Sequence, residues 1–565
     1  MTTRGQASDK QASDKQASDK WAGGPRPYAA SLVPLPSPTR TDGSHARLGK
    51  SLGLAALSGL LLAGALPHLD WGWLAWIGLV PFLTLFPFRS RRAAFGHGIV
   101  LGICFLGVMA YWIILFAAHL IGPALSTLGW VLVTLYQAFY LGVWAVGAQW
   151  LRTRPSPWAF RLGVPALWAI VEWWRQSGTL ALGWGDLAYT QHLALMLLQV
   201  TKLTGIWGLA FLLVLVNVAL AETLKARRVG VFAGATAGLV VLTLVYGALT
   251  IRGERLRPTF VAAALQGNII QDVPQDPAYV EHVMRTFLGQ SREAAAHGAT
   301  LVVWPETAFP GYLLSDEGTR QRTQAQAYRA HQAMVIGGVE FDGSLHKSAN
   351  SLFLMDAQGN VTGSYQKRQL VPFGEFVPGV ARFPFLKALH VTPSDMKAGA
   401  DTQMLLDGGP GIGPIGATVC FESSYPRFLR EQVARGAGLL VISTDDAWFG
   451  RTAAARQHSA IAAVRAAETD RYLVRSAATG ISQIVDPTGR VLAEAGLFRP
   501  AVVWGRVESR ATLTPYVRWG DWFVGLCALL LAGAPLMPGS AGRKREKALA
   551  SEEGRAEMPT EMGEA

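Results

Sequence analysis

The sequence predicts an α-helical transmembrane bundle of about eight spans joined to an α/β domain outside the cytoplasm. Hydrophobic residues make up 50% of the 565 residues and charged residues only 16%, a composition unusual for a soluble protein. Apolar runs of membrane-spanning length recur along the chain. One long stretch lacks such runs and has the pattern of a globular domain, so the chain combines both classes.

Eight apolar runs are long enough for membrane helices, which need about 18 or more largely uncharged residues. They lie at 51–67, 71–88, 95–118, 124–151, 163–180, 197–221, 230–250 and 519–538. The N-terminal stretch repeats QASDK three times and is then rich in Pro and Ser, so it has too little apolar area to fold. We therefore expect a disordered cytoplasmic arm, seven transmembrane helices, a globular domain with the candidate catalytic residues, a closing transmembrane helix and a cytoplasmic tail (1–50, 51–251, 252–512, 513–540 and 541–565).

The orientation follows from the Lys and Arg residues, which cytoplasmic loops retain. Basic clusters stand before the first run and after the second, fourth and sixth (Arg40, Arg47, Lys50; Arg89, Arg91, Arg92; Arg152, Arg154, Arg161; Lys225, Arg227, Arg228). The loops after the first and third runs hold no Lys or Arg, and the only such residue at the outer end of the fifth run is Arg175, near its membrane edge. This alternation predicts cytoplasmic termini and an extracytoplasmic domain at 252–512. The net charge of +12 then reflects the basic residues that mark the cytoplasmic loops, and we expect no nucleic-acid binding.

The globular stretch alternates short apolar strands with amphipathic, Ala-rich helical segments. Strands are predicted at 259–266, 300–306, 333–340, 351–356, 415–421 and 439–444, and helices at 278–297, 317–331, 426–436 and 453–468. This is the pattern of layered α/β domains. Reactive residues in such domains gather where strands run out into loops.

Three residues near predicted strand ends form a candidate site for acyl-transfer chemistry. Cys420 follows a strand and is expected to be exposed enough to react, Glu306 could take its proton, and Lys367 could offset developing negative charge. By residue type alone each is more often structural, so the local sequences carry the prediction. The other cysteines, Cys104 and Cys527, lie in apolar runs, where a free thiol behaves as a small hydrophobe. No metal-ligand spacing is present, and no cofactor is expected.

The local sequences resemble those of a known superfamily. WPE at 304–306, K-x-x-LVPFGE at 367–375 and VCFES at 419–423, followed by DDAWFG at 445–450, resemble the Glu-Lys-Cys triad of the nitrilase (carbon-nitrogen hydrolase) superfamily. Seven spans before such a domain and one after it resemble the apolipoprotein N-acyltransferase family. The resemblance covers residues from about 50 to about 540.

The resemblance implies a nitrilase-like α-β-β-α sandwich and a role for each matched residue. Glu306 would be the general base, Cys420 the nucleophile that carries the acyl chain as a thioester, and Lys367 the cation beside the oxyanion, with the backbone N–H after Cys420 as a second donor. Glu375 would orient the lysine or the incoming amine, and Glu422 matches a further acidic position in the cysteine motif. The family's substrates are a phospholipid donor and a diacylglyceryl-cysteine apolipoprotein acceptor. We expect a monomer in the bacterial plasma (inner) membrane.

Three positions depart from the family pattern. Phe421 follows the cysteine where family members often have Tyr, and Asp445 stands where Asn is expected. After QGNIIQ at 266–271 the family commonly has a substrate-contacting Trp, but here the region holds Gln275 and no Trp occurs before Trp304. None of these changes removes a triad member.

Other interpretations stay open on the sequence alone. The stretch 376–389, rich in Phe, Val and Pro, is either a lid that keeps water from a thioester or an ordinary packed loop. A membrane-tethered amidase or nitrile hydrolase would use the same triad without a lipid donor. A transporter with a sensor domain would need charges or broken helices along a membrane path, and few such charges are present.

Overall fold

The computed structural model describes residues 42–269, 276–379, 382–383 and 395–538. The part before the globular domain is helical. Its elements are α1 (Asp42–Ala65), η1 (Gly72–Trp76), α2 (Val80–Leu83), α3 (Arg91–Gly102), η2 (Ile103–Gly107), α4 (Trp112–Ile121), α5 (Pro123–Arg152), α6 (Pro157–Arg175), η3 (Leu187–Gln191), α7 (Leu195–Leu198), α8 (Thr201–Thr204), α9 (Ile206–Ala226) and α10 (Val231–Gly253).

Among the described residues, four helices are long and apolar enough to cross a membrane: Ala46–Ala65, Pro123–Arg152, Ile206–Ala226 and Val231–Gly253. A fifth is added if Arg91–Gly107 and Trp112–Ala118, bent by 58° to each other, form one span. The expectation of one continuous helix over 71–88 is wrong. Only η1 and α2 form there, because Pro81 and Pro87 lack the backbone N–H that a helix needs. The total of eight spans stays a prediction.

Two six-stranded sheets form the globular part. The first has the order β12-β1-β2-β3-β4-β5 and the second β11-β10-β9-β8-β7-β6. The strands are β1 (Phe260–Gln266), β2 (Ala299–Val303), β3 (Ala333–Asp342), β4 (Lys347–Met355), β5 (Val361–Gln366), β6 (Leu406–Asp407), β7 (Pro414–Val419), β8 (Leu439–Thr444), β9 (Leu473–Ala477), β10 (Gln483–Val485), β11 (Val491–Glu494) and β12 (Ala501–Val507). All six predicted strands are present, whereas β5, β6 and β9 to β12 were not predicted.

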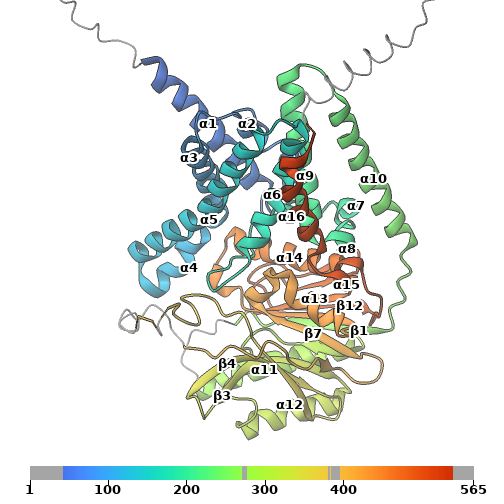
Figure 1. The fold of residues 1–565 in the computed structure, drawn as a ribbon. Helices are drawn as coiled ribbons and strands as arrows, with labels where there is room; N and C mark the ends of the chain where they lie inside the picture. Colours follow the sequence, from blue (N-terminus) through green and yellow to red (C-terminus); the bar gives the residue numbers. More distant parts are fainter. Residues whose placement is uncertain (1–41, 270–275, 380–381, 384–394, 539–565) are drawn as a thin grey trace, which may run out of the picture. The chain divides into compact units, whose positions relative to one another are not determined.

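The sheets pack face to face, with helices on both outer faces (Figure 1). Helices α11 (Pro277–Ala296) and α12 (Glu317–Ala330) cover the first sheet, and α13 (Pro426–Ala434) and α14 (Ala453–Thr469) cover the second. Successive strand residues point to opposite faces. In β1, for example, Ala262 and Ala264 join the core between the sheets, while Ala263 and Leu265 pack with α11. The four layers form the expected α-β-β-α sandwich.

The closing part of the chain is α15 (Pro515–Trp519), α16 (Trp522–Gly533) and η7 (Ala534–Leu536). The apolar stretch Trp522–Leu536 is shorter than the spanning helices above. Asp521, at its start, accepts hydrogen bonds from Trp207 Nε1 at 3.0 Å and Trp173 Nε1 at 3.3 Å, and it pairs with Arg430 at 3.0 Å. Its carboxylate therefore links α9 and α6 with α13 of the globular part.

Strand direction brings several strand ends to one edge of the sandwich. Strands β1, β2 and β3 are parallel, and β5 runs in their direction because β3, β4 and β5 are antiparallel neighbours. Strands β7, β8 and β9 are likewise parallel in the second sheet. Glu306 follows β2, Lys367 follows β5, Cys420 follows β7 and Asp445 follows β8. These four residues thus each follow the carboxyl end of a strand.

One glycine makes room for the segment that carries Glu306. A Cβ added to Gly337 in β3 would lie 2.0 Å from the Pro305 carbonyl oxygen and 2.8 Å from Glu306 Cα. We expect Gly337→Ala to lower the free energy of unfolding by about 1–3 kcal/mol, because backbone has to move. Thermal unfolding of the purified protein measures this, with Gly343→Ala as the matched control, since its Cβ would meet nothing closer than 4.0 Å. Equal melting temperatures for the two variants would contradict the packing argument.

Candidate active site

Glu306 is buried beyond the end of β2, with 6% of its surface exposed. Its Oε1 accepts hydrogen bonds from Asn350 Nδ2 at 2.6 Å and Lys367 Nζ at 3.2 Å. Its Oε2 accepts one from the backbone N–H of Asp445 at 2.7 Å. Donors from β4, from the segment after β5 and from the segment after β8 therefore fix both carboxylate oxygens.

Lys367 places one buried ammonium between two carboxylates. Its Nζ lies 3.2 Å from Glu306 Oε1 and 2.8 Å from Glu375 Oε1, and the side chain is 1% exposed. Burial alone would lower the pKa of Lys367, but the charges of Glu306 and Glu375 hold it well above its usual range. The lysine therefore stays charged at neutral pH.

Cys420 lies directly beyond β7, at the first position of the short 3₁₀ turn η5 (Cys420–Ser424). Its φ of +52° is in the left-handed region, which residues with side chains rarely adopt. Ser423 Oγ donates to the Cys420 carbonyl oxygen at 2.8 Å. The expectation of an exposed thiol is wrong, because only 8% of Cys420 is exposed; the turn packs under the apolar core between the layers.

The electrostatic surroundings of Cys420 contain both other predicted triad members. Burial raises the pKa of the Cys420 thiol well above its usual range, and the Glu306 carboxylate raises it further. The Lys367 ammonium and a hydrogen bond with Thr444 act in the opposite direction. The structure thus brings Glu306, Lys367 and Cys420 together, and the sulfur stays protonated at neutral pH.

Glu375 and Glu422 take different positions around the triad. Glu375 contacts Lys367 directly, and its Oε2 accepts from the backbone N–H of Val371 at 2.8 Å. Glu422 is fully buried and accepts backbone hydrogen bonds from Val419, Arg368 and Gln369 at 2.8, 2.6 and 3.1 Å. Burial raises the pKa of Glu422, although the three backbone N–H donors act to lower it. Glu422 therefore ties the Lys367 segment to the Cys420 turn.

A buried network that the sequence did not predict lies behind Cys420. His458 Nε2 is 3.1 Å from the Cys420 carbonyl oxygen, and its Nδ1 is 3.0 Å from Asp446 Oδ1. Asp446 Oδ2 pairs with Arg475 Nη2 at 2.8 Å, and all three side chains are inaccessible to solvent. Although burial alone would raise it, Arg475 and His458 hold the pKa of Asp446 well below its usual range. The only sequence signal was that Asp446 belongs to DDAWFG.

The loop between α6 and α7 also contacts the Cys420 turn and its neighbours. Trp184 Nε1 donates to Gln457 Oε1 at 2.8 Å, and its ring stacks near Phe421 with centroids 6.3 Å apart. Tyr189 OH donates to the Ser424 carbonyl at 3.3 Å, and Tyr425 OH donates to the Ala181 carbonyl at 2.6 Å. The helical part of the chain thus packs directly against the segment that holds Cys420.

Two expectations lie wholly or largely outside the described residues. Gln275 and its neighbours at 270–275 are outside, and so is most of 376–389, of which 376–379 and 382–383 are described. The possible lid therefore stays a prediction. Asp445, in contrast, is described: its Oδ1 accepts from the Ala447 N–H at 2.9 Å while its own N–H holds Glu306.

Comparison with known proteins first defines the class of the globular part. Residues 261–516 match the carbon-nitrogen hydrolase family. Among solved structures, an amidase from Nesterenkonia sp. is 20% identical, covers 48% of this chain and 98% of its own, and gives a TM-score of 0.36, a likeness too low to support an argument. The site described above therefore lies in a carbon-nitrogen hydrolase domain.

The rest of the chain narrows the class to one family. Residues 58–219 match the apolipoprotein N-acyltransferase N-terminal domain. Proteins named apolipoprotein N-acyltransferase are 33% identical in Geobacter metallireducens and 35% identical in Gloeobacter violaceus, each match covering 87% of this chain and 95% of the relative. The protein of that name in Pseudomonas putida is 31% identical, with 87% and 97% covered. The chain belongs to the apolipoprotein N-acyltransferase family.

The acid at position 445 gives a pH-dependent prediction. Burial raises the pKa of Asp445 from 3.8 to about 8, and the charges of Glu306 and Asp446 add to this shift against the Ala447 hydrogen bond. Between these two pKa values the folded state keeps a proton on Asp445 that the unfolded chain releases. The contribution of Asp445 to stability therefore falls as pH rises from about 4 to about 8. The variant Asp445→Asn cannot ionise at this position and does not lose this stability. The melting temperature of the variant should exceed that of the native protein only slightly at pH 5, by more as the pH rises to 8, and by a constant amount above that.

The matched control is Asp401→Asn, because Asp401 is fully exposed. We expect no pH-dependent difference between that variant and the native protein. A difference for Asp445→Asn that stays constant from pH 5 to pH 9 would show that Asp445 is ionised throughout and would contradict the assignment.

Proposed function

We propose that this protein transfers an acyl chain from a phospholipid to the N-terminal α-amino group of a diacylglyceryl-cysteine apolipoprotein, the last step of bacterial lipoprotein maturation. The family membership of both parts of the chain supports this activity. The observation that carries the proposal is the convergence of a carboxylate, an ammonium and a thiol, Glu306, Lys367 and Cys420, in one buried cluster at the strand ends.

In the first half-reaction, Cys420 is the nucleophile and Glu306 the general base. Because the pKa of the thiol is raised, the sulfur attacks the donor ester carbonyl as Glu306 takes its proton. The charged Lys367 and the backbone N–H of Phe421 stabilise the oxyanion. When the tetrahedral intermediate collapses, the leaving glycerol oxygen takes the proton from Glu306. The products are a lysophospholipid and a thioester on Cys420.

In the second half-reaction, the free amine of the acceptor attacks the thioester. The amine has to be uncharged to attack, and Glu306 in its carboxylate form accepts the proton that it releases. The carbon–sulfur bond breaks as the amide forms, and the sulfur regains a proton from Glu306. The site then returns to its first state, so the reaction is ping-pong and needs no cofactor.

The surrounding residues have supporting roles in this proposal. Glu375 positions the Lys367 ammonium at 2.8 Å, and Glu422 fixes the Lys367 segment against the Cys420 turn. Phe421, where the resemblance leads us to expect Tyr, carries no hydroxyl, and its ring packs against Trp184.

The proposed location is the bacterial plasma (inner) membrane, with about eight spans, both termini in the cytoplasm and the catalytic domain outside. The alternation of basic loops supports this orientation. The proposed divisions of the chain are those at 50, 251, 512 and 540, and the proposed state is a monomer. Pulling an acyl chain into water costs about 0.8 kcal/mol per CH₂, so a site beside the outer leaflet avoids that cost.

Intact-mass analysis of the purified protein after incubation with phospholipid tests the function. We expect a mass gain of one acyl chain that hydroxylamine removes and that a diacylglyceryl-cysteinyl peptide discharges. The gain should be absent in Cys420→Ala and retained in the matched control Cys104→Ala. Glu306→Gln should form the adduct about 10²–10⁴-fold more slowly, since the general base is lost.

Two outcomes would contradict the proposal. An unchanged mass in lipid together with hydrolysis of small amides would make the protein a membrane-tethered amidase with the same triad. An adduct that forms equally fast in Cys420→Ala would place the acyl chain on another residue.

A further inference from the structure

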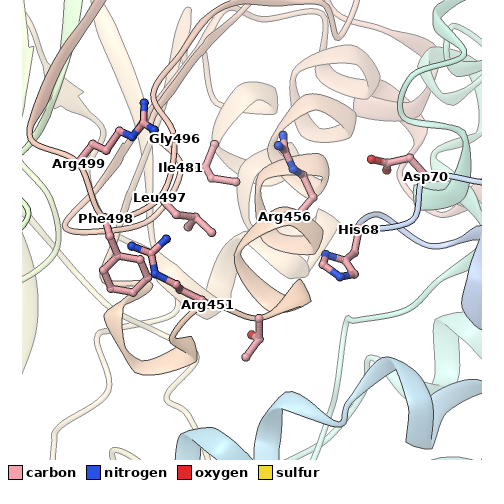
Figure 2. A pocket seen from close by; sticks show the side chains of 10 residues that line it. His68, Asp70, Arg451, Arg456, Ile481, Gly496, Leu497, Phe498 and Arg499 are labelled. Carbon is pink, nitrogen blue, oxygen red and sulfur yellow. The ribbon is translucent and has the colours of Figure 1, made fainter.

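A cavity of about 620 Å³ lies apart from the catalytic cluster and shares no lining residue with it. Figure 2 shows its walls: His68 and Asp70 on one side, Arg451, Phe498 and Arg499 on the other, and Arg456 between them. These residues come from the turn after α1, the start of α14 and the loop between β11 and β12. With Ile481 from the loop between β9 and β10, four segments line one space.

The cavity carries more positive charge than its neighbours neutralise. Of its three arginines, Arg456 pairs with Glu494 at 3.1 Å. Arg451 lies over the Phe498 ring, 4.9 Å from its centre, and within the described part of the chain neither it nor Arg499 forms an ion pair with a carboxylate. The lining acid Asp70 is 3.7 Å from His192 Nε2. Two guanidinium groups are therefore available to an anion.

The position of the cavity in the chain associates it with the membrane surface. The turn that carries His68 and Asp70 begins directly after the candidate span Ala46–Ala65. Leu69, Trp71 and Trp73 in and after this turn are 49%, 53% and 62% exposed. Exposed tryptophans beside the end of an apolar helix are typical of the headgroup level of a bilayer. A phosphate group that enters this cavity from the headgroup level would belong to a lipid.

We propose that this cavity binds the phosphodiester of a phospholipid whose headgroup is net negative. Guanidinium groups match phosphate oxygens in geometry and charge, and two uncompensated arginines favour a headgroup without a compensating ammonium. The bound lipid is a positioning ligand rather than the reacting donor. It connects the turn after α1 with the start of α14, the helix whose His458 contacts the Cys420 carbonyl.

Native mass spectrometry of the full-length protein in non-ionic detergent tests the proposal. Dioleoylphosphatidylglycerol is titrated in, with dioleoylphosphatidylcholine as the zwitterionic comparison. We expect the double variant Arg451→Ala/Arg499→Ala to hold one phosphatidylglycerol about ten-fold or more weakly than the native protein. Phosphatidylcholine should bind the native protein more weakly than phosphatidylglycerol does, and the double variant should bind phosphatidylcholine about as well as the native protein. All proteins compared carry Cys420→Ala, so no acyl chain is transferred to Cys420 and the readout is independent of the proposed acyl transfer.

The matched control is Arg292→Ala/Arg329→Ala, which removes the same charge from exposed positions on α11 and α12. It should bind phosphatidylglycerol like the native protein. Because Arg451 and Arg499 are exposed, the test variant should keep the native melting temperature; Arg451→Lys/Arg499→Lys checks that retained charge restores part of the binding. Equal phosphatidylglycerol binding in the test and control variants would overturn the proposal. Complete displacement of the lipid by millimolar inorganic phosphate would also overturn it, and would assign the cavity to a soluble anion.

Discussion

A single ammonium group, that of Lys367, is buried between the carboxylates of Glu306 and Glu375, and the site depends on this arrangement. Removing one partner of a buried ion pair costs about 3–5 kcal/mol, because it leaves a charge without compensation. Two carboxylates around one ammonium leave an excess of negative charge beside Cys420. The excess keeps the lysine charged. Burial and the excess together keep the thiol protonated, so the sulfur becomes nucleophilic only when Glu306 takes its proton.

The fold places a second charged network beside the backbone of the nucleophile. Asp446 is held between Arg475 and His458, and His458 reaches the carbonyl oxygen of Cys420. The first network acts on the sulfur. The second contacts the backbone of the strained turn, and the charge of its Asp446 also raises the pKa of the thiol. Both arise because parallel strands of two facing sheets end at the same edge. The loop that holds Trp184 and Tyr189 then couples this edge to the apolar helices.

Strong local patterns allowed much of this to be predicted from the sequence. Strands β1 to β4, β7 and β8 have continuous apolar runs, and the motifs around Glu306, Lys367 and Cys420 marked residues that the structure brings together. The short strands β10 and β11 were missed because runs of three or four residues have no clear period. The Cys420 burial and the Asp446–His458–Arg475 network depend on contacts between distant segments, which no local pattern contains. A helix over 71–88 was expected because the stretch is apolar and largely uncharged, and the effect of Pro81 and Pro87 was not taken into account.

The most direct test of the proposed proton arrangement is an ultraviolet titration of the Cys420 thiolate in the free enzyme. The absorbance difference between the native protein and Cys420→Ser isolates this thiol, because Cys104 and Cys527 are common to both. We expect no thiolate signal at neutral pH and its appearance only above pH 9.0, the ordinary pKa of a cysteine. A thiolate already present at pH 7 would contradict it, because Glu306 would then have no proton to remove from the sulfur.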